Sequence, residues 1–568
     1  MAVGSPAESF DLVIVGSGGG GLTAALAAAE AGLKPVILEK REVVGGSTSM
    51  SGGVVWMPNN PLMRAAGVPD SYEAGLTYLQ SVVGDPDDAS SMERRKAFLA
   101  QGPAMISFIQ RKGVKLTRCE GYSDYYDNRK GGHARGRSIE GIPWDGRQLG
   151  EWHSKINPGM GRSLDLAVMT NEVRNLPAAF RSARSFRAAA RVVLRTKISR
   201  LLGKDLLTNG MSLVGQLTKA CVDTGIPIWL NTDVRELVVS EGRVVGVRAE
   251  RDGVPTVVTG TGGVLLAAGG FERNGEMRLS YNADTQPNDG ERTMGNPGNT
   301  GTVLQAAIAL GAKVDYMDEA VWNPAPRREI AISNLTTARQ FPHTIFVNKS
   351  GRRFVNESNS YIEVVKAMYA NDAVPAWLIF DDAFRRKYPW GRGMPKIRNL
   401  ASVLPGRLPE EWVSQGWIKR ADTVEELARL IGVDPRTLAT TVANFNEYAT
   451  RGQDPEFNRG VSQYNKALGD PGNKPNPAVG TLAEPPFYAT EIFAADVGTI
   501  GGVITNQYAQ VLDQQLEPIA GLYAAGNMAA TVVGRTYPGA GASIAHTMTF
   551  GYIAAHHVAD LRTQVPAS

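Results

Sequence analysis

The feature that most constrains the fold is a strand, a glycine-rich turn and a helix at the start of the chain. The apolar run FDLVIV (residues 10–15) leads directly into Gly16-Ser17-Gly18-Gly19-Gly20-Gly21, and an alanine-rich helix is predicted over residues 22–31. In this GxGxxG pattern Gly16 permits the tight turn, Gly18 lets backbone approach a pyrophosphate at the positive helix N-terminus, and Gly21 lets the helix pack on the strand. The pattern predicts a nucleotide-binding α/β fold.

An acidic residue follows the next strand at the position where nucleotide-binding folds use one. The strand is predicted for residues 35–38, and Glu39 comes 23 residues after Gly16. A carboxylate there can hold ribose hydroxyls. The alternative, a glycine-rich turn in an unrelated α/β domain, is therefore disfavoured.

Three further segments favour FAD over NAD. Lys40 and the glycines and hydroxyls of residues 45–53 could wrap a diphosphate and the edge of a flavin, which NAD-only domains do not need. Residues 263–270 read as a buried strand that ends in glycines, after a predicted strand pair at 234–239 and 243–250. Near the C-terminus, residues 519–527 precede a glycine-rich turn and a closing helix.

These separated segments predict an α/β chain in which a Rossmann-like FAD-binding domain is built from both chain ends and a catalytic domain is inserted between them. The predicted division is 1–320 and 487–568 for the FAD-binding domain and 321–486 for the α+β catalytic domain. Proline-rich turns are expected near the crossings, at 324–326 and 475–477. Two helices, broken at Asp434-Pro435, are expected within residues 423–448.

Composition excludes several other classes of protein. The net charge of +4, from 60 basic and 56 acidic residues, is too balanced for a protein whose main partner is nucleic acid. Two cysteines, Cys119 and Cys221, exclude a disulfide framework, a CxxC pair and a thiolate iron–sulfur site, and favour a reducing cytoplasm. His133 and His343 lack partners at metal-ligand spacing, so no metal is expected. Neither a signal peptide nor an apolar membrane span is indicated.

Three tyrosine-bearing segments, together with the nucleotide segments, carry a resemblance to a known family. They are Tyr122-Ser123-Asp124-Tyr125-Tyr126, the run of residues 356–361 (NESNSY), and Gly534-Arg535-Thr536-Tyr537-Pro538-Gly539-Ala540-Gly541. The whole chain resembles the two-domain flavoproteins that include fumarate reductases. The three segments resemble those of the 3-ketosteroid Δ1-dehydrogenases, and the third segment, with its TYPGAG motif, is the most specific of the three.

The resemblance implies FAD-dependent 1,2-desaturation of a 3-ketosteroid. It places the general base at Tyr361, acting as a tyrosinate on the C2 proton, and its supporting tyrosine at Tyr125. Tyr537 and the backbone amide of Gly541 would polarise the C3 carbonyl as an oxyanion hole, and hydride would pass from C1 to flavin N5. Tyr122, Tyr126, Tyr316 and Tyr369 are interpreted as packing residues, and His546, His556 and His557 as capping or surface residues.

The segments and the resemblance together assign a set of residues to FAD. Within it, the resemblance puts Val234 against adenine and Asn527 against the ribityl or pyrophosphate region. The full set is Gly16, Ser17, Gly18, Gly20, Gly21, Glu39, Lys40, Gly46, Ser47, Thr48, Ser51, Gly52, Gly53, Val234, Ala268, Gly269, Asn299, Gly526, Asn527, Ser543 and Ile544.

Other functions stay open at this stage. On the same scaffold, the enzyme could desaturate Δ4 of a ketosteroid or could be a fumarate-reductase-like flavoprotein. A fumarate reductase needs clustered arginine and histidine to hold a dicarboxylate and protonate carbon, whereas the informative positions here carry tyrosine. A different class would be a flavin-bearing membrane-surface protein with no turnover of its own.

A basic insert is predicted within the first part of the FAD-binding domain, at about residues 173–205. From Val173 to Lys204 the insert carries nine basic and no acidic residues, and Phe186, Ala190, Leu194, Ile198 and Leu201 recur at helical spacing beside arginines. Such a helix could lie on an anionic bilayer, gaining about 1 kcal/mol per basic residue near the surface, or could pack its apolar stripe on the protein.

The insert bears on localisation and substrate. The protein is expected in the cytoplasm, on the inner face of the cell membrane if the insert binds lipid, where it could meet steroids that keep an alkyl side chain, such as cholest-4-en-3-one. No haem or iron–sulfur site is expected in the chain, so an external acceptor, a quinone or a soluble carrier, would reoxidise the flavin.

Overall fold

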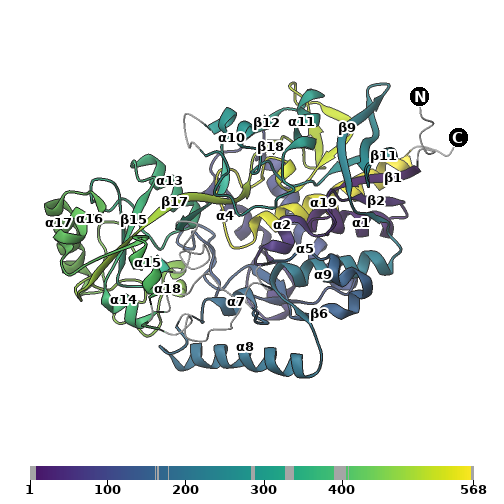
Figure 1. The fold of residues 1–568 in the computed structure, drawn as a ribbon. Helices are drawn as coiled ribbons and strands as arrows, with labels where there is room; N and C mark the ends of the chain where they lie inside the picture. Colours follow the sequence, from purple (N-terminus) through teal and green to yellow (C-terminus); the bar gives the residue numbers. More distant parts are fainter. Residues whose placement is uncertain are drawn as a thin grey trace.

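The computed structural model is a mixed α/β molecule built on two sheets (Figure 1). It describes residues 8–159, 162, 165–176, 178–282, 288–326, 338–388, 405–406 and 408–564. The larger sheet has the strand order β19-β20-β11-β1-β2-β8, with β10 and β9 continuing from β11. The second sheet has the order β13-β17-β15-β14, with β16 also paired to β17.

Both ends of the chain contribute to the larger sheet. Strand β1 (Glu8–Val15) pairs in parallel with β2 (Pro35–Leu38) and with β11 (Val254–Leu266), and β11 pairs in parallel with β20 (Pro518–Ala524). Parallel central strands are buried on both faces, which is why these segments read as continuous apolar runs. The predicted Rossmann-like fold assembled from both chain ends is therefore confirmed.

Helices cover the faces of this sheet and bring its glycine-rich turn to the centre of the molecule. Helix α1 (Gly19–Glu30) packs against α19 (Ala542–Gln564) and α9 (Asn209–Asp223). Helix α1 begins three residues earlier than predicted, because the glycines that follow its N-cap, Gly18, already take part in the helix. The predicted strand pair is present as β9 (Thr232–Ser240) and β10 (Arg243–Arg251).

The second sheet belongs mainly to the inserted part of the chain. Its strands are β13 (Ala320–Pro326), β14 (Thr344–Val347), β15 (Ala376–Phe380), β16 (Ile418–Ala421) and β17 (Phe487–Thr499). The turn expected at 324–326 is wrong, since these residues end β13. Proline is tolerated there because β13 lies at the edge of its sheet and pairs only with β17.

The predicted domain division stays a prediction, and we propose one change to it. Strand β17 pairs with β13, β15 and β16, so residues 487–499 lie in the second sheet although the division assigns them to the FAD-binding part. A boundary after Thr499 keeps that sheet whole. The two helices expected within 423–448 are α16 (Val424–Ile431) and α17 (Pro435–Ala449).

The remaining elements connect and cover the two sheets. They are α2 (Gly46–Met50), β3 (Val54–Trp56), α3 (Pro61–Ala65), α4 (Tyr72–Val83), α5 (Met92–Arg111), β4 (Leu116–Arg118), β5 (Ser138–Gly141), β6 (Trp144–Asp145), η1 (Gly146–Lys155), α7 (Thr170–Val173), α8 (Ala183–Leu201), β7 (Leu206–Leu207), β8 (Ile228–Trp229), α10 (Gly275–Asn282), α11 (Thr302–Ala309), β12 (Val314–Asp315), α13 (Tyr361–Ala370), α14 (Asp382–Lys387), α15 (Glu410–Ser414), α18 (Gln463–Leu468), β18 (Gly502–Val503), β19 (Gln510–Leu512) and η3 (Gly526–Met528).

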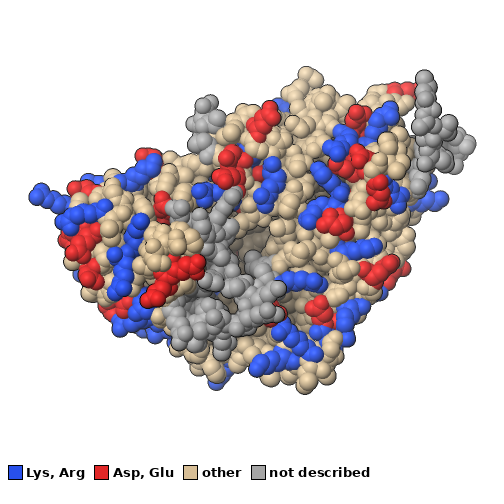
Figure 2. Space-filling model, in the orientation of Figure 1, with Lys and Arg blue, Asp and Glu red and all other residues tan. Residues whose placement is uncertain are grey.

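Helix α8 is the centre of the basic insert and turns its apolar stripe to solvent. Phe186 is 56% exposed, Leu194 59% and Leu201 88%, whereas the helix buries Ser185, Val192 and Thr196 against the protein. The alternative in which the stripe packs on the protein is therefore wrong. The helix lies along the lower edge of the molecule in Figure 1, where Figure 2 shows a concentration of basic side chains. No helix within the described ranges is long and apolar enough to cross a membrane.

A buried ion-pair network holds the inserted part together. The carboxylate of Glu357 accepts hydrogen bonds from Arg353 and from Arg459, and Arg353 also binds Asp454. The side chains of all four residues are buried. Buried charges are tolerated only when paired and hydrogen-bonded, so the loop that carries Glu357 is fixed by this network.

Removing one partner of this network should destabilise the inserted part strongly. We expect Arg353→Met to lower its free energy of unfolding by about 3–5 kcal/mol, because the buried carboxylate of Asp454 would lose its cation and Glu357 would keep only Arg459. Urea unfolding followed by tryptophan fluorescence measures the effect. The control is Arg352→Met at the neighbouring exposed arginine, which should change stability by no more than about 0.5 kcal/mol. Equal midpoints for the two variants would contradict the structural role of the network.

Candidate active site

A cavity of about 700 Å³ lies where the two parts of the chain meet. Its walls come from the glycine-rich turn after β1, from residues 46–54, from the ends of β11 and β20, and from tyrosines of the inserted part. Figure 2 shows the surface hollowed near its centre. Segments far apart in the sequence thus form one site.

Nearly all of the residues predicted to bind FAD line this cavity. The exceptions are Gly20 and Gly21, which lie inside helix packing instead. A Cβ on Gly21 would lie 2.0 Å from the carbonyl oxygen of Gly16, so glycine is needed for the contact of α1 with β1, as predicted. A Cβ on Gly20 would lie 2.7 Å from the carbonyl oxygen of Thr547 in α19.

The N-terminus of α1 opens on the cavity with backbone donors. Gly18 caps the helix without a side-chain hydrogen bond, and a Cβ there would meet nothing closer than 3.8 Å. The amide of Gly19 donates to Thr48 Oγ1 at 3.1 Å. A helix N-terminus with this free space suits a pyrophosphate.

Glu39 is positioned by hydrogen bonds at the end of β2. Its Oε2 accepts from the Ser17 amide at 3.1 Å and from the Ser17 hydroxyl at 2.5 Å, and its Oε1 accepts from the Arg41 amide at 3.0 Å. Burial raises the pKa of Glu39, and these hydrogen bonds oppose the rise. The carboxylate lines the cavity, where ribose hydroxyls could reach it.

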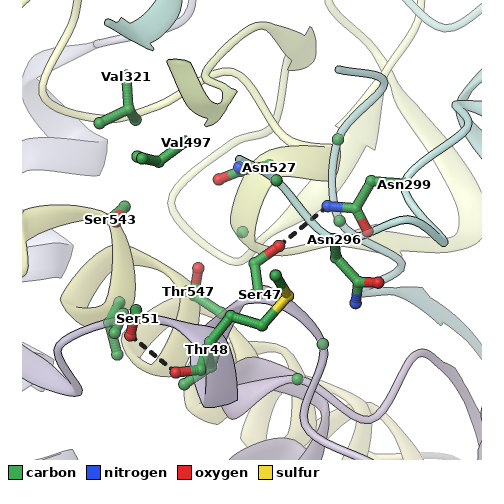
Figure 3. A pocket seen from close by; sticks show the side chains of 18 of the residues that line it. Ser47, Thr48, Ser51, Asn296, Asn299, Val321, Val497, Asn527, Ser543 and Thr547 are labelled. Carbon is green, nitrogen blue, oxygen red and sulfur yellow. Dashed lines mark hydrogen bonds between the residues drawn. The ribbon is translucent and has the colours of Figure 1, made fainter. Parts of the chain in front are cut away.

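A polar cluster that sequence reasoning partly missed lies beside Ser47. The side-chain amide of Asn299 donates to Ser47 Oγ at 3.2 Å, as Figure 3 shows, and to Glu272 at 2.7 Å. Glu272 is fully buried, and burial raises its pKa to about 7. No motif marks Glu272 in the sequence, where it stands two residues after Gly270 in the loop that follows β11. Asn296 and Thr547 also face the cavity.

The donor set and the shape of this part of the cavity fit FAD. Gly16 has φ +107° and its Cβ would lie 2.3 Å from the Ala267 carbonyl oxygen, so the backbone makes a cradle that any side chain would fill. Helix α1 and Gly526 supply amides, Glu39 an acceptor and Lys40 a cation. A dinucleotide with a diphosphate and two sugar-like segments meets complementary groups along this wall.

Three tyrosines from three distant segments converge beside this wall. Tyr125 and Tyr361 have ring centroids 5.5 Å apart, and Tyr537 lies 5.8 Å from each. The Tyr125 hydroxyl donates to the Tyr361 hydroxyl at 3.2 Å. All three line the cavity, so the structure brings together the residues that the sequence singled out.

The electrostatics of Tyr361 oppose the formation of a tyrosinate in part. Burial raises the pKa of Tyr361 well above its usual value, the neighbouring Tyr537 raises it further, and the hydrogen bond from Tyr125 lowers it. Tyr361 is the first residue of α13, where the positive end of the helix dipole favours a negative side chain. The support expected from Tyr125 is present, but burial outweighs it.

Tyr537 lies beside two further polar groups. Its hydroxyl is 3.0 Å from Ser543 Oγ. Burial raises the pKa of Tyr537, whereas hydrogen bonds from Ser543 and from the Gly541 amide lower it. Gly541 has φ +93° and its Cβ would lie 2.1 Å from the Val54 carbonyl oxygen, so the close packing on β3 requires glycine there.

A fourth tyrosine in the cluster has no signal in the sequence. Tyr464 of α18 lines the cavity, and its ring centroid lies 4.7 Å from that of Tyr125. Tyr122, interpreted as a packing residue, also lines the cavity, with the Arg174 guanidinium 5.1 Å above its ring. Its neighbour Tyr126 donates to Glu363 at 2.8 Å.

The interpretation of His546 as a capping or surface residue is wrong. It is buried, and its Nδ1 accepts from the Val532 amide at 3.3 Å and lies 3.1 Å from Thr531 Oγ1. Burial lowers its pKa well below the usual value, so the ring is neutral. Within the described ranges, no cluster of three metal-ligating side chains is present.

Comparisons with known proteins identify relatives over the whole length. Residues 11–544 match the family described as FAD binding domain. The 3-oxosteroid 1-dehydrogenase of Mycobacterium tuberculosis is 39% identical over 97% of this chain and 99% of its own. The crystal structure of 3-ketosteroid Δ1-dehydrogenase from Sterolibacterium denitrificans, in complex with 1,4-androstadiene-3,17-dione, superposes with a TM-score of 0.88 at 35% identity, covering 98% of this chain and all of that one.

A further solved structure shares the fold. The 3-ketosteroid-Δ4-(5α)-dehydrogenase from Rhodococcus jostii RHA1 has a TM-score of 0.65 at 21% identity, covering 98% of each chain. At this identity the likeness shows the fold alone.

Replacing Glu39 by Gln should weaken FAD binding about ten- to a hundredfold. A Gln side chain accepts weaker hydrogen bonds than a carboxylate, both from Ser17 and Arg41, which position it, and from the ribose hydroxyls of FAD. Hydrogen bonds to a charged group contribute about 1.5–3 kcal/mol each. Fluorescence titration of the apoprotein with FAD measures the dissociation constant. Glu42→Gln, at an exposed carboxylate three residues along the chain, is the control and should bind FAD like the unchanged protein. Equal dissociation constants for both variants would remove Glu39 from the site.

Proposed function

Because the chain belongs to the FAD-dependent 3-oxosteroid 1-dehydrogenases, we propose that Tyr361 removes the C2 proton of a 3-ketosteroid while Tyr537 and the Gly541 amide polarise its C3 carbonyl. The family, the cofactor and the enzyme class predicted from the sequence are confirmed by these relatives. The residue roles are our proposal.

The observation that carries the proposal is the convergence of the three tyrosines. Tyr125 comes from the loop after β4, Tyr361 from the first turn of α13 and Tyr537 from the loop before α19, yet their rings lie within 6 Å of one another. The Tyr361 hydroxyl accepts a hydrogen bond from the Tyr125 hydroxyl at 3.2 Å. A phenol that donates in this way favours the anion of Tyr361.

Each residue answers one demand of the chemistry. The C2–H bond is acidic only while the adjacent carbonyl oxygen can take enolate charge, and two donors aimed at that oxygen are worth about 3 kcal/mol each in comparable sites. The Tyr361 tyrosinate takes the proton, the C1–C2 double bond forms, and a hydride leaves C1. Bound FAD supplies the hydride acceptor.

The lining of the cavity disfavours a dicarboxylate substrate. Among the described residues that line it, Arg174 is the single arginine and there is no histidine. Arg174 donates to the carbonyl oxygens of Glu120 and Gly121 and stacks over Tyr122, so its donors are largely occupied. A fumarate reductase would need a cluster of such cations. Desaturation at Δ4 stays an alternative that product analysis can decide.

We propose that α8 docks on an anionic membrane surface. Its exposed apolar stripe adjoins exposed basic residues at 184, 187, 191 and 197, which is the pattern of a helix that lies in the lipid interface. Arg195 of α8 binds Glu172, and Arg181, two residues before the helix, binds Asp470 at 3.0 Å, so ion pairs hold α8 and the segment before it to the protein. Helix α8 thereby keeps one face for the protein and one for the membrane.

The link between α8 and the cavity suggests which steroids are used. Thr170 and Val173 of α7, and the adjacent Arg174, line the cavity about ten residues before α8 begins. A steroid drawn from lipid would meet this wall on its way in. We infer a preference for poorly soluble 3-ketosteroids that keep an alkyl side chain, such as cholest-4-en-3-one. A quinone in the same bilayer or a soluble carrier would reoxidise the flavin, at the inner face of the cell membrane.

Tyr361→Phe should leave FAD bound and reduce kcat by about three orders of magnitude, because only the proton acceptor is lost. In the unchanged protein kcat should rise from neutral toward alkaline pH. The sign follows from the raised pKa of Tyr361, since a proton acceptor acts only in its deprotonated form, which a raised pKa confines to higher pH. Steady-state turnover of a soluble 3-ketosteroid, with product identification, measures both.

Tyr369→Phe is the matched control for this prediction. Tyr369 lies on the same helix, α13, and packs on Trp322 outside the tyrosine cluster. It should keep kcat within about twofold. More than a tenth of the original kcat in Tyr361→Phe would remove Tyr361 from the role of base.

The triple variant Leu194→Ser, Ile198→Ser, Leu201→Ser should lose binding to anionic vesicles. Each of these exposed side chains would contribute about 1.5–3 kcal/mol to binding when it is buried in lipid. Co-sedimentation with phosphatidylcholine–phosphatidylglycerol vesicles at low salt measures it, and high salt should weaken the unchanged protein too. Leu430→Ser, at an exposed leucine of α16, is the control and should sediment normally. Unchanged protein that stays in the supernatant would refute the membrane assignment.

A further inference from the structure

A buried arginine lies behind the tyrosine cluster. The side chain of Arg339 is fully buried, and its Nη1 donates to the carbonyl oxygens of Glu357 and, at 2.7 Å, Asn359. These two carbonyls belong to the loop that leads directly into Tyr361. Arg339 therefore contacts the segment that positions the proposed base.

The charge of Arg339 has no carboxylate of its own among the described residues. The nearby Glu357 carboxylate is taken by Arg353 and Arg459, and Asp454 by Arg353. Arg339 Nε and Nη2 find no hydrogen-bond partner of good geometry in the described structure. The charge of a buried cation acts strongly on neighbouring groups, because the protein interior screens it less than water does.

The groups toward which this field acts are the phenols of the cavity. Burial raises the pKa of Tyr464, whereas the charge of Arg339 and hydrogen bonds from Arg339 and Gln340 lower it. The field also reaches Tyr125 and Tyr361, whose anions would in turn favour the guanidinium cation. The ring of Tyr464 contacts that of Tyr125, which hydrogen-bonds Tyr361, so the arginine and the base are joined by a continuous row of phenols.

The other charged groups around Tyr361 cannot provide this support. On α13 itself, Glu363 binds the Tyr126 hydroxyl and Lys366 pairs with Glu319 at 2.8 Å. From the other side, Tyr537 raises the pKa of Tyr361. Among the described residues, Arg339 is the buried cation that contacts the loop before Tyr361.

We propose that Arg339 is a positioning residue for this reaction, whose buried positive charge favours the tyrosinate at Tyr361 while its Nη1 holds the loop before α13. The inference rests on the proposed role of Tyr361 and adds to it the source of the charge that a buried tyrosinate requires.

The test compares two variants that both remove the guanidinium group and differ in charge, Arg339→Gln and Arg339→Lys. In the FAD-loaded enzyme, kcat for a soluble 3-ketosteroid is measured against pH. We expect the midpoint of the alkaline rise to move up by about 1 pH unit or more in Arg339→Gln and by clearly less in Arg339→Lys, with kcat of the Gln variant recovering at high pH. A role in structure alone would lower kcat at every pH and leave the midpoint in place.

A midpoint in Arg339→Gln equal to that of the unchanged protein would overturn the proposal, as would equal changes in both variants. If Arg339→Gln does not retain FAD, Arg339→Met of similar length replaces it in the same comparison. Arg352→Gln removes a charge from an exposed neighbour and should leave the profile unchanged. Tyr361→Phe, run in parallel, separates the two hypotheses, because activity in that variant would refute the proposed base whatever the Arg339 variants do.

Discussion

One buried carboxylate, that of Glu357, holds the part of the structure on which the active site depends. It accepts from Arg353 and Arg459, and it also accepts from the amide of Phe346 in β14 at 3.0 Å. The loop from Glu357 to Tyr361 is thus fixed at its start by charge and at its end by helix α13. A tyrosine from the inserted part is in this way held against Tyr125 and Tyr537, which the other part of the chain supplies.

The cofactor wall depends on a different constraint, the absence of side chains. At Gly16, Gly21 and Gly541 a Cβ would lie within 2.3 Å of a backbone carbonyl oxygen. The contact of Gly16 brings the turn after β1 against Ala267 at the end of β11, and the contact of Gly21 brings α1 against that turn. The contact of Gly541 lays the loop before α19 on β3. Cofactor wall and tyrosine cluster are joined at this third contact, since Tyr537 and Gly541 lie in one short loop.

Much of this arrangement could be predicted from the sequence because its signals are local. The strand, glycine turn and helix at residues 10–31, Glu39 and the TYPGAG segment each carry their meaning within a few residues. Tyr464, Glu272 and Arg339 could not be found in this way, because each acquires its role only through contacts with residues far away in the chain. The same holds for the environment of His546 and for the solvent-facing stripe of α8, since periodicity shows that a face is apolar and leaves open what covers it.

Helix α8 and the cavity wall are mechanically one unit. Arg195 of α8 binds Glu172 of α7, Thr196 Oγ1 accepts from the Ala167 amide at 2.9 Å, and Thr170 at the start of α7 hydrogen-bonds the carbonyl of Gly52 beside the cavity. These bonds couple the position of α8, through α7, to the position of this wall. By thermodynamic reciprocity, a molecule that fills the cavity and displaces α7 would change the affinity of α8 for a ligand on its outer face. Binding at that face would change the affinity of the cavity for the molecule by the same factor.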